Sequence, residues 1–577
     1  MTHAGQPPPA YTPESNEKLI IALDFGTTYS GIAYCFASQR DPKVVSIVDW
    51  PGAEGQTAPK IPTLINYPDP NDNTKFSWGA SVSKLQNNIV GVKLCLDPSQ
   101  EKPEYLRDGL VPRTLQQLPK EPVDVAADFI GAIYKHALSE IQEVVPDDYF
   151  SICQKQFVLS VPAVWSDAAK NATMQAAKTA GIFPVTLIKE PEAAALHTMH
   201  SLDFSLKEGD AFVVCDAGGG TVDLVSYEVS ALTPTLKLKE VAPGTGSMSG
   251  SLGLNERFAD AVRDLVGEFE FDYLKKTKGY QLGMKSFELE VKRAFNGDLD
   301  EEYFVNFPMA SLEDDPEGGL EANCWRMTGQ HLKDIFAPLV HDIQCLVADQ
   351  LKRIRQNRPG CKISGVFLVG GFGSNRYLKS CIQKQHPDVQ VLQPSDAWAA
   401  IVKGAALSSL PQKAKIVSSS STKHYGTLSN DRYDSVLDAG VPKVWDRHYG
   451  FSRAPRMTWY IKIGDDIQRD QRIKFPFYRS IDVNHHPDDL IFQSILYECV
   501  EKHAPLHEFG QPVHQNCTLV SDLRNIPRNL FNMKRGVDGE LYYDVNFDLV
   551  ITLKSALMEF SLEFDGKPFG TVSPKFT

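Results

Sequence analysis

The stretch that decides the fold is IIALDFGTTYSGIAYCF, residues 20–36. An apolar run ends at Asp24, a turn of glycine and threonines follows, and a second β-like run comes directly after it. A similar stretch, FVVCDAGGGTVDLVSYEV, occupies residues 212–229 and places Asp216 at the corresponding point. Short apolar runs bounded by such turns predict buried strands. Two copies about one domain length apart predict two related lobes whose turns face each other.

The two turns carry the groups that a triphosphate site requires. Glycines let backbone N–H groups approach phosphate oxygens without a Cβ in the way, and threonine hydroxyls add donors. Carboxylates beside phosphates repel them unless a cation lies between, so Asp24 and Asp216 predict Mg²⁺. A single copy is equally consistent with a plain strand–turn–strand hairpin. The predicted phosphate-binding residues are Gly26, Thr27, Thr28, Gly218, Gly219, Gly220 and Thr221.

Around these turns, strand-like runs alternate with helical patterns from about residue 18 to 410. Residues 125–141 place apolar side chains on one helical face, and residues 167–180 follow Ser166, a favourable N-cap. Residues 332–354 form a third apolar-striped helix that contains Pro338. The alternation predicts an α/β fold with sheets covered by helices.

We expect five segments along the chain. A proline-rich leader over residues 1–17 is predicted to be disordered. The two lobes span residues 18–205 and 206–410. A serine-rich linker follows at 411–424, and period-2 alternation predicts a β-rich domain at 425–577.

Composition excludes several classes of partner. The chain has 577 residues, with 59 Lys and Arg against 72 Asp and Glu, and a net charge of −13. This balance argues against a general nucleic-acid or membrane-surface binder, because both polyanions repel the protein as a whole. No signal-peptide pattern or long apolar run occurs. The 10 cysteines form no C-x-x-C pair and predict buried thiols in a reducing compartment. We expect a cytoplasmic protein with no nucleic-acid or membrane partner.

Four ordered motifs within residues 18–410 resemble the seventy-kilodalton heat-shock chaperones, within the superfamily of actin-like ATPases. They are LDFGTTYSGIAY, VLSVPAVWSDAAKNATMQAAKTAGI with LIKEPEAAAL, VVCDAGGGTVDLV and VFLVGGFGSNRYL. The GGFGS turn and the divergent C-terminus resemble the twelfth-class branch and its fungal relatives more than the standard chaperone. The resemblance implies a two-lobed actin-like ATPase fold with duplicated ribonuclease-H-like subdomains that binds ATP or ADP with Mg²⁺.

The resemblance also implies roles for individual residues. Thr27, Thr28 and Tyr29 would contact the phosphates, and Gly370 with Gly371 would form the turn on the adenosine side. Asp24 and Asp216 are the expected metal-binding residues. The expected catalytic residues are Lys93, Glu190, Asp216 and Thr221.

The adenosine side departs from the family pattern. Lys292 and Arg293 match a basic pair that flanks the adenosine, but the family's glutamate falls on Leu289, with Glu288 and Glu290 out of register. A phenylalanine, Phe372, replaces a small polar residue. The expected arginine falls on Ser374, with Arg376 near enough to substitute, and the stretch 396–404 has two extra residues.

Beyond residue 410 the chaperone pattern ends, without the acidic–leucine linker, helical lid or acidic C-terminal tetrapeptide. Three functions stay open. The first is an ATP-binding, slowly hydrolysing switch that acts on an unknown protein partner or client. The second is a nucleotide-binding scaffold without turnover. The third is a small-metabolite kinase, for which Asp167 is the available catalytic aspartate, although the sequence places it at a capped helix start.

Overall fold

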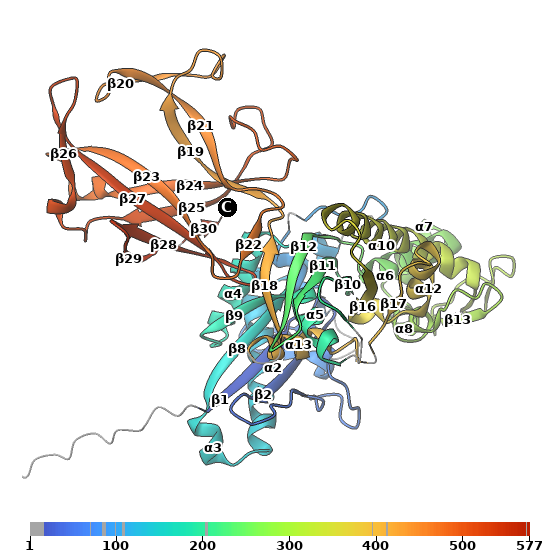
Figure 1. Ribbon diagram of the computed structural model, residues 1–577. Coiled ribbons are helices and arrows are strands. Elements are labelled where there is room, and N and C mark those ends of the chain that lie inside the picture. Colours follow the sequence, from blue (N-terminus) through green and yellow to red (C-terminus); the bar gives the residue numbers. More distant parts are fainter. Residues whose placement is uncertain are drawn as a thin grey trace, which may run out of the picture.

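The computed structural model describes residues 17–69, 71–82, 88–98, 100–106, 110–201, 206–394, 396–410, 414–572 and 574–576. Residues 18–410, the α/β region, are mixed helix and sheet. Residues 424–576, the β-rich region, contain strands joined by loops and two short 3₁₀ helices (Figure 1). The predicted change of architecture along the chain is therefore confirmed. The predicted leader lies, except for residue 17, outside the described residues.

The first sheet of the α/β region is built on β1 (Lys18–Asp24), which is buried except at Lys18. Strand β1 pairs antiparallel with β2 and parallel with β8. The order is β3-β2-β1-β8-β9, with β4 paired to β2. The other members are β2 (Tyr29–Phe36), β3 (Val45–Ser46), β4 (Ile61–Pro62), β8 (Gln154–Val161) and β9 (Val185–Lys189).

The second sheet repeats this local arrangement around β10 (Ala211–Ala217), which is buried throughout. Strand β10 pairs antiparallel with β11 and parallel with β16, as β1 does with β2 and β8. The order is β17-β16-β10-β11-β12-β18-β22. The other members are β11 (Val222–Ala231), β12 (Leu236–Ser247), β16 (Ile363–Val369), β17 (Val391–Leu392), β18 (Ala414–Ser420) and β22 (Asp466–Gln468).

Two helices, α5 (Glu190–Ser201) and α13 (Ala400–Ser408), lie between the sheets and share a core with both. They approach so closely that a Cβ on Gly404 would lie 1.7 Å from the carbonyl oxygen of Ala193. Ile20 of β1 and Val214 of β10 belong to this same buried cluster. The shared core fixes the ends of β1 and β10 relative to each other, and with them the two glycine turns.

The predicted helices form on the outer faces of the sheets. Helix α2 (Pro122–Glu143) buries its apolar stripe, and α4 (Asp167–Thr179) begins at Ser166, whose Oγ accepts a hydrogen bond from the Ala169 N–H. Helix α10 (Gly329–Asn357) contains Pro338 in its interior. The remaining helices are α1 (Leu110–Gln117), α3 (Asp147–Ile152), α6 (Leu252–Val266), α7 (Glu268–Leu274), α8 (Lys278–Ser286), α9 (Lys292–Ala294), α11 (Gly370–Gly373) and α12 (Arg376–Gln385).

Two small sheets complete the α/β region. One has the order β6-β5-β7 and the other β13-β15-β14. Their strands are β5 (Leu64–Asn66), β6 (Ser77–Trp78), β7 (Ile89–Val90), β13 (Glu302–Asn306), β14 (Leu320–Glu321) and β15 (Cys324–Thr328).

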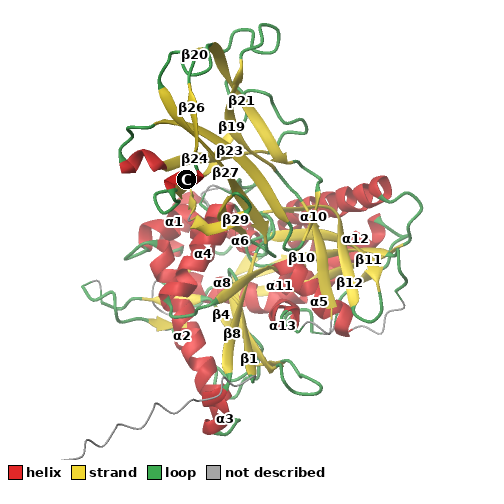
Figure 2. Ribbon diagram, turned by 60° about the vertical axis from the view of Figure 1, so that its left-hand side comes forward, coloured by secondary structure: helices red, strands yellow, loops and turns green. Residues whose placement is uncertain are grey.

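The β-rich region packs two antiparallel sheets around one apolar core, which includes Phe475, Leu496 and Phe547. It stands at one end of the molecule, with the longer helices confined to the α/β region (Figure 2). The first sheet contains β20 (Val444–Asp446), β21 (Phe451–Ile461), β19 (His424–Arg432), β24 (Ile491–Cys499), β25 (His514–Asp522) and β30 (Pro574–Phe576). The second contains β23 (Arg472–Asp482), β27 (Leu541–Leu553), β28 (Met558–Phe564), β29 (Lys567–Val572) and β26 (Asn532–Arg535).

The serine run is not the exposed connection that its composition predicts. Residues 414–420 form strand β18, which pairs parallel with β12 and antiparallel with β22. Ala414, Ile416, Ser418 and Ser420 are buried, so the period-2 pattern of a strand outweighs the loop preference of serine. The second sheet therefore continues directly into the chain that leads to the β-rich region; residues 411–413 lie outside the described ranges.

Candidate functional site

A cavity of about 310 Å³ lies where the turns after β1, β10 and β16 meet. Asp24 and Asp216 both line it, so the two duplicated turns share one site. Arg376, by contrast, is exposed at the start of α12 and does not line the cavity. The other sequence-predicted residues that line it are Gly26, Thr27, Thr28, Tyr29, Lys93, Glu190, Gly218, Gly219, Gly220, Thr221, Lys292, Arg293, Gly370 and Gly371.

The two glycine turns touch each other. A Cβ on Gly219 would lie 2.4 Å from Oγ1 of Thr28, and a Cβ on Gly220 would lie 2.6 Å from Oγ1 of Thr27. Any larger residue at either glycine would push the turns apart. The third turn also meets them, because a Cβ on Gly370 would lie 2.4 Å from Oδ1 of Asp216. Gly370 has a φ of +83°, which a side chain would strain.

The carboxylate of Asp24 is held by two buried donors. Lys60 Nζ lies 2.6 Å from Oδ2, and the Ser160 hydroxyl donates to Oδ1 at 2.8 Å. Burial opposes the charge of Asp24, but Lys60 and Lys93 outweigh it and lower the pKa of the carboxyl. Lys60 was not among the predicted residues. It reaches the site because β4 pairs with the start of β2, a long-range contact that no local pattern reports.

Lys93 and Glu190 form a second buried pair. Lys93 lies in a short 3₁₀ helix, Val92–Leu96, and its Nζ lies 2.5 Å from Oε1 of Glu190 at the start of α5. Burial raises the pKa of Glu190 to about 7, with Asp24 and Asp223 adding to the rise while Lys93 opposes it. The Glu190 carboxyl therefore changes protonation near neutral pH.

Asp216 is the least compensated carboxyl group of the site. Among the described residues, its buried Oδ1 has no hydrogen-bond partner. Burial, followed by the nearby carboxylates of Glu190, Asp223 and Asp24, raises the pKa of Asp216 well above its usual range. A carboxylate oxygen without a hydrogen-bond partner therefore lies near three further carboxylates. A divalent cation would reduce the repulsion between these groups, so these residues fit Mg²⁺.

No set of three His, Cys, Asp or Glu side chains within the described residues converges as a ready-made metal site. A cation of the magnesium type keeps several waters and binds through few carboxylates and the phosphates of a substrate. Asp216 and Asp24 are the side chains of this cavity that would face such an ion.

On the opposite wall, the helix that carries Lys292 and Arg293 contains one π-helical turn, Phe287–Val291. Glu288 also lines the cavity wall, 4.0 Å from Lys292 one helical turn further on. Glu288 is thus out of register with the family's glutamate but lies at the same cavity. Burial lowers the pKa of Lys292 to about 8, and its Nζ donates to Oδ1 of Asn255 at 2.9 Å.

Aromatic side chains line the cavity near Arg293, and one of them is Tyr29, which the resemblance assigns to the phosphates rather than to the adenosine. Tyr29 lies edge-on to Trp398, with ring centroids 5.4 Å apart, and its hydroxyl accepts a hydrogen bond from Arg293 at 3.5 Å. Phe372 and Ile401 also line the cavity. Trp398 lies in the stretch that has two extra residues relative to the family, so this departure brings an aromatic ring to the cavity rather than removing a contact.

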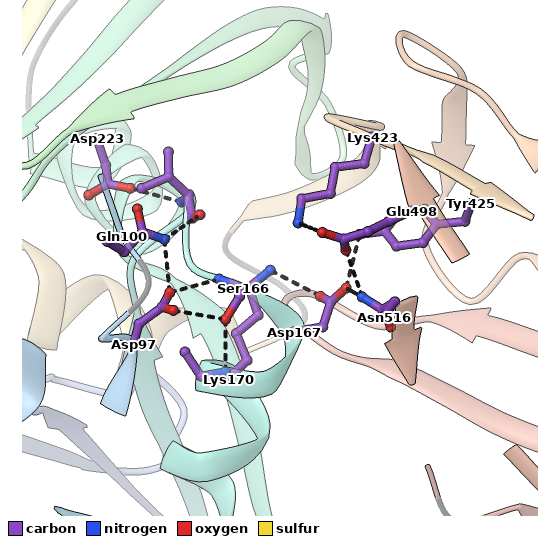
Figure 3. Close-up of polar contacts among 12 residues, drawn as sticks. Asp97, Gln100, Ser166, Asp167, Lys170, Asp223, Lys423, Tyr425, Glu498 and Asn516 are labelled. Carbon is purple, nitrogen blue, oxygen red and sulfur yellow. Dashed lines mark hydrogen bonds and ion pairs between the residues drawn. The ribbon is translucent and has the colours of Figure 1, made fainter. Parts of the chain in front are cut away.

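A series of polar contacts runs from Asp223, in the strand that follows the second glycine turn, to the β-rich region (Figure 3). The backbone N–H of Val164 donates to Oδ1 of Asp223 at 3.1 Å, and two residues later Ser166 donates through its N–H and hydroxyl to Asp97. The next residue, Asp167, accepts hydrogen bonds from Tyr425 and Asn516 of the β-rich region, at 3.0 and 2.9 Å.

Asp167 therefore does not face the cavity of the glycine turns. The predicted helix start at Ser166 is confirmed, but the carboxylate is buried at the junction with the β-rich region. Since a kinase needs its catalytic aspartate beside the acceptor and the γ-phosphate, Asp167 loses that role.

Comparisons with known proteins agree with the architecture of the α/β region. The family model described as Hsp70 protein matches residues 20–409. Heat shock 70 kDa protein 12A of Homo sapiens is 26% identical over 497 residues, which covers 71% of this chain and 72% of that protein. Heat shock 70 kDa protein 12B of Homo sapiens is 24% identical over 498 residues, with coverages of 68% and 69%.

A further similarity is confined to a shorter part of the chain. Chaperone protein DnaK of Burkholderia cenocepacia is 27% identical over 278 residues, or 46% of this chain and 38% of that protein. The matches to proteins 12A and 12B confirm the resemblance to the divergent twelfth-class branch, and the family match confirms the mixed α/β fold of an actin-like ATPase.

Among the described residues, none of the helices is both long and apolar enough to span a bilayer. The chain belongs to the Hsp70 protein family.

Proposed function

We propose that this chain is an ATP-binding, chaperone-like switch that binds ATP with Mg²⁺ between two actin-like lobes and hydrolyses it slowly. The lobes would be the duplicated ribonuclease-H-like halves at residues 18–205 and 206–410. The observation that supports this most is the contact of Gly219 and Gly220 with Thr28 and Thr27. Two phosphate-binding turns that touch across one cavity can close around a single polyphosphate.

Within this proposal each wall has its own task. The backbone N–H groups of the glycine turns and the hydroxyls of Thr27, Thr28 and Thr221 would bind phosphate oxygens. Mg²⁺ would neutralise phosphate charge, held from the side of Asp24 and Asp216. Lys292, Arg293 and the ring of Trp398 would bind the nucleoside. Asp24 and Ser160 would stay hydrogen bonded, which keeps the first turn in place.

Hydrolysis would depend on Lys93 and Glu190. Phosphoryl transfer to water relies mainly on positioning and charge neutralisation, and Lys93 supplies a buried positive charge at the cavity wall. Glu190, with a pKa of about 7, is matched to accept a proton from water near neutral pH. Lys93 and Glu190 would each act on hydrolysis while they remain paired with one another.

The β-rich region would transmit the nucleotide state to a protein partner or client. A ligand shifts a two-state equilibrium only through its different affinity for the two states. Closure of the two turns on ATP would displace Val164 and Ser166, which connect Asp223 to the junction at Asp167. The 10 free cysteines fit the reducing cytoplasm, which we propose as the location.

One observation favours the second candidate, a scaffold that binds nucleotide without turnover. Lys93 and Asp24 are both already engaged, by Glu190 at 2.5 Å and Lys60 at 2.6 Å. If these pairs persist with nucleotide bound, neither side chain is free to act on the γ-phosphate.

Single-turnover hydrolysis of ATP, with protein in excess, distinguishes the two. We expect Asp216→Asn and Thr221→Ala to slow the step at least about tenfold, because each removes a group at the phosphate wall. The exposed Asp272→Asn is a matched charge control and should leave the rate unchanged. Rates that are the same in all four proteins would refute hydrolysis by this site and support the scaffold.

A further inference from the structure

A second cavity, of about 90 Å³, lies at the junction of the α/β region and the β-rich region. We call it the junction cavity. Its walls come from α4, the end of β9, the segment from β18 to β22 and the turn between β27 and β28. Among the described residues, none lines both this cavity and the cavity of the glycine turns.

Four cationic side chains line the junction cavity, and each comes from a different element. They are Lys170 of α4, Lys189 of β9, Arg469 after β22 and Lys554 after β27. Two of them have tight ion pairs outside the cavity. Arg469 contacts Glu192 closely, and Lys554 Nζ lies 2.6 Å from Asp470.

The other two cations are only loosely paired. Lys170 Nζ lies 3.4 Å from Oδ1 of Asp167, and Lys189 Nζ lies 3.7 Å from Glu240. Asp167 itself lines the cavity, but its Oδ2 accepts from Tyr425 and Asn516. Lys170 is buried and Lys189 half-buried, and each of these two ammonium groups has only a distant carboxylate partner among the described residues.

The electrostatics of Lys170 agree with this geometry. Burial lowers the pKa of Lys170, and the positive charges of Lys189 and Lys423 lower it further, although Asp167 opposes them. A buried ammonium repelled by two others is stabilised by an additional anion.

Hydroxyl groups complete the wall. Ser419, Ser420, Ser421 and Thr422 line the cavity from one side and Ser555 from the other. Ser421 donates to the backbone carbonyl of Lys423 and Ser555 to the carboxylate of Glu192, so these two hydroxyl protons are already engaged. Ser420 and Thr422 are hydroxyls of the same wall that would donate, together with the lysines, to the oxygens of a tetrahedral oxyanion.

We propose that the junction cavity binds a free oxyanion of phosphate size, held between Lys170 and Lys189. Its size admits a small ion and excludes a nucleotide. Its four cationic side chains outnumber Asp167, the carboxylate on the described lining, and so disfavour a metal ion. A bound oxyanion would connect α4 and β9 with the segments around Ser420 and Ser555, and so would stabilise the junction between the two regions.

Calorimetric titration of the full chain with inorganic phosphate, at constant ionic strength, tests the proposal. We expect Lys170→Met and Lys189→Met each to weaken one class of phosphate sites at least about tenfold, since each removes a charge-assisted hydrogen bond. Phosphate that binds at the glycine turns should keep its affinity in both variants, which distinguishes it from phosphate in the junction cavity. Sulfate should compete, whereas phosphoserine, an ester too large for the cavity, should not.

Lys178→Met is the matched control, because it removes the same charge from an exposed position of the same helix. It should leave phosphate binding unchanged. If Lys170→Met fails to fold, Lys189→Met decides the outcome, because its side chain is more exposed. Phosphate affinities in Lys189→Met equal to those of the unaltered protein, competition by phosphoserine, or no phosphate site apart from the glycine turns, would overturn the proposal.

Discussion

Lys60 Nζ lies 2.6 Å from Oδ2 of Asp24, with both side chains almost fully buried. The carboxylate that the sequence assigns to the metal is therefore already neutralised by a cation of its own chain. Asp216, the corresponding carboxylate of the second turn, has no hydrogen-bond partner at Oδ1 within the described part of the chain. The two duplicated turns are thus alike in backbone but opposite in charge balance, and magnesium would be drawn mainly toward Asp216.

This asymmetry gives a prediction for Lys60→Met. Without ligand, the substitution leaves the buried Asp24 charge with only Ser160 and Lys93 to compensate it, and should lower the free energy of unfolding by about 3 kcal/mol. Addition of ATP with Mg²⁺ should recover more stability than in the unaltered protein, because the cation replaces the lost ammonium. Thermal and urea unfolding with and without ligand measure both effects.

The control for this prediction is Lys75→Met. Lys75 pairs with Asp72 at 2.8 Å but is 76% exposed. Exposed pairs contribute little, so its loss should change the free energy of unfolding by less than about 0.5 kcal/mol. A Lys60→Met protein as stable as Lys75→Met would show that Asp24 does not depend on Lys60.

Glu190 leads to a prediction about pH. Its pKa rises from 4.5 to about 7 on folding, so between these values the folded state binds more protons than the unfolded state. Stability without ligand should therefore fall as pH rises through this window, and the loss should be smaller in Glu190→Gln. The difference between the two proteins should reach at most about 3 kcal/mol. Urea unfolding at pH 5 and pH 7 tests it.

Glu268→Gln removes a carboxylate that is 77% exposed and serves as the reference. Its pH dependence should equal that of the unaltered protein. An unchanged pH dependence in Glu190→Gln would mean that Glu190 is ionised throughout this range.

Gly219→Ala tests the contact between the two turns. The added Cβ would lie 2.4 Å from Oγ1 of Thr28, so the turns must separate. We expect nucleotide affinity to fall at least about a hundredfold, because one turn no longer reaches the phosphates held by the other. Gly131→Ala, where a Cβ meets Ala180 at an ordinary 3.6 Å, should leave the affinity unchanged. Equal nucleotide affinities in Gly219→Ala and Gly131→Ala would show that nucleotide binding does not depend on the contact between the two turns.

Tyr425→Phe tests the junction. The Tyr425 hydroxyl donates to the buried Asp167 carboxylate, and its loss should lower the free energy of unfolding by about 1–3 kcal/mol. In a double-mutant cycle with Asp167→Asn the two effects should not add. Tyr542→Phe removes a hydroxyl that donates to Asp538 at 2.7 Å at an exposed site and should have little effect. Additive effects of Tyr425→Phe and Asp167→Asn would show that the two side chains act separately.

The strands and helices that carry the site follow from the sequence because their signals are local. Strands β1 and β10 are short apolar runs, and α4 begins at a serine cap. The glycine turns are also evident, since backbone approach to a phosphate leaves few alternatives to glycine. These features place the cavity and nearly all of its predicted lining.

What the sequence does not give depends on long-range or irregular geometry. Lys60 reaches Asp24 through strand pairing, and Trp398 reaches Tyr29 from a segment far along the chain. Glu288 lines the cavity from a helix that contains one π-helical turn, which the sequence does not reveal. Ser418 is buried in a strand because β12 and β22 lie on either side of it. The contacts of Lys60, Trp398 and Ser418 join residues far apart in the chain, so local composition does not report them.

The central inference, that two turns close around one magnesium-bound nucleotide, is tested most directly by equilibrium titration of the full chain with ATP. The titration is run with and without Mg²⁺, and in Asp24→Asn and Asp216→Asn. We expect one ATP per chain in the unaltered protein, bound more tightly with Mg²⁺, and a weaker Mg²⁺ dependence in each variant, most of all in Asp216→Asn. More than one ATP per chain, or a Mg²⁺ dependence that neither substitution changes, would contradict it.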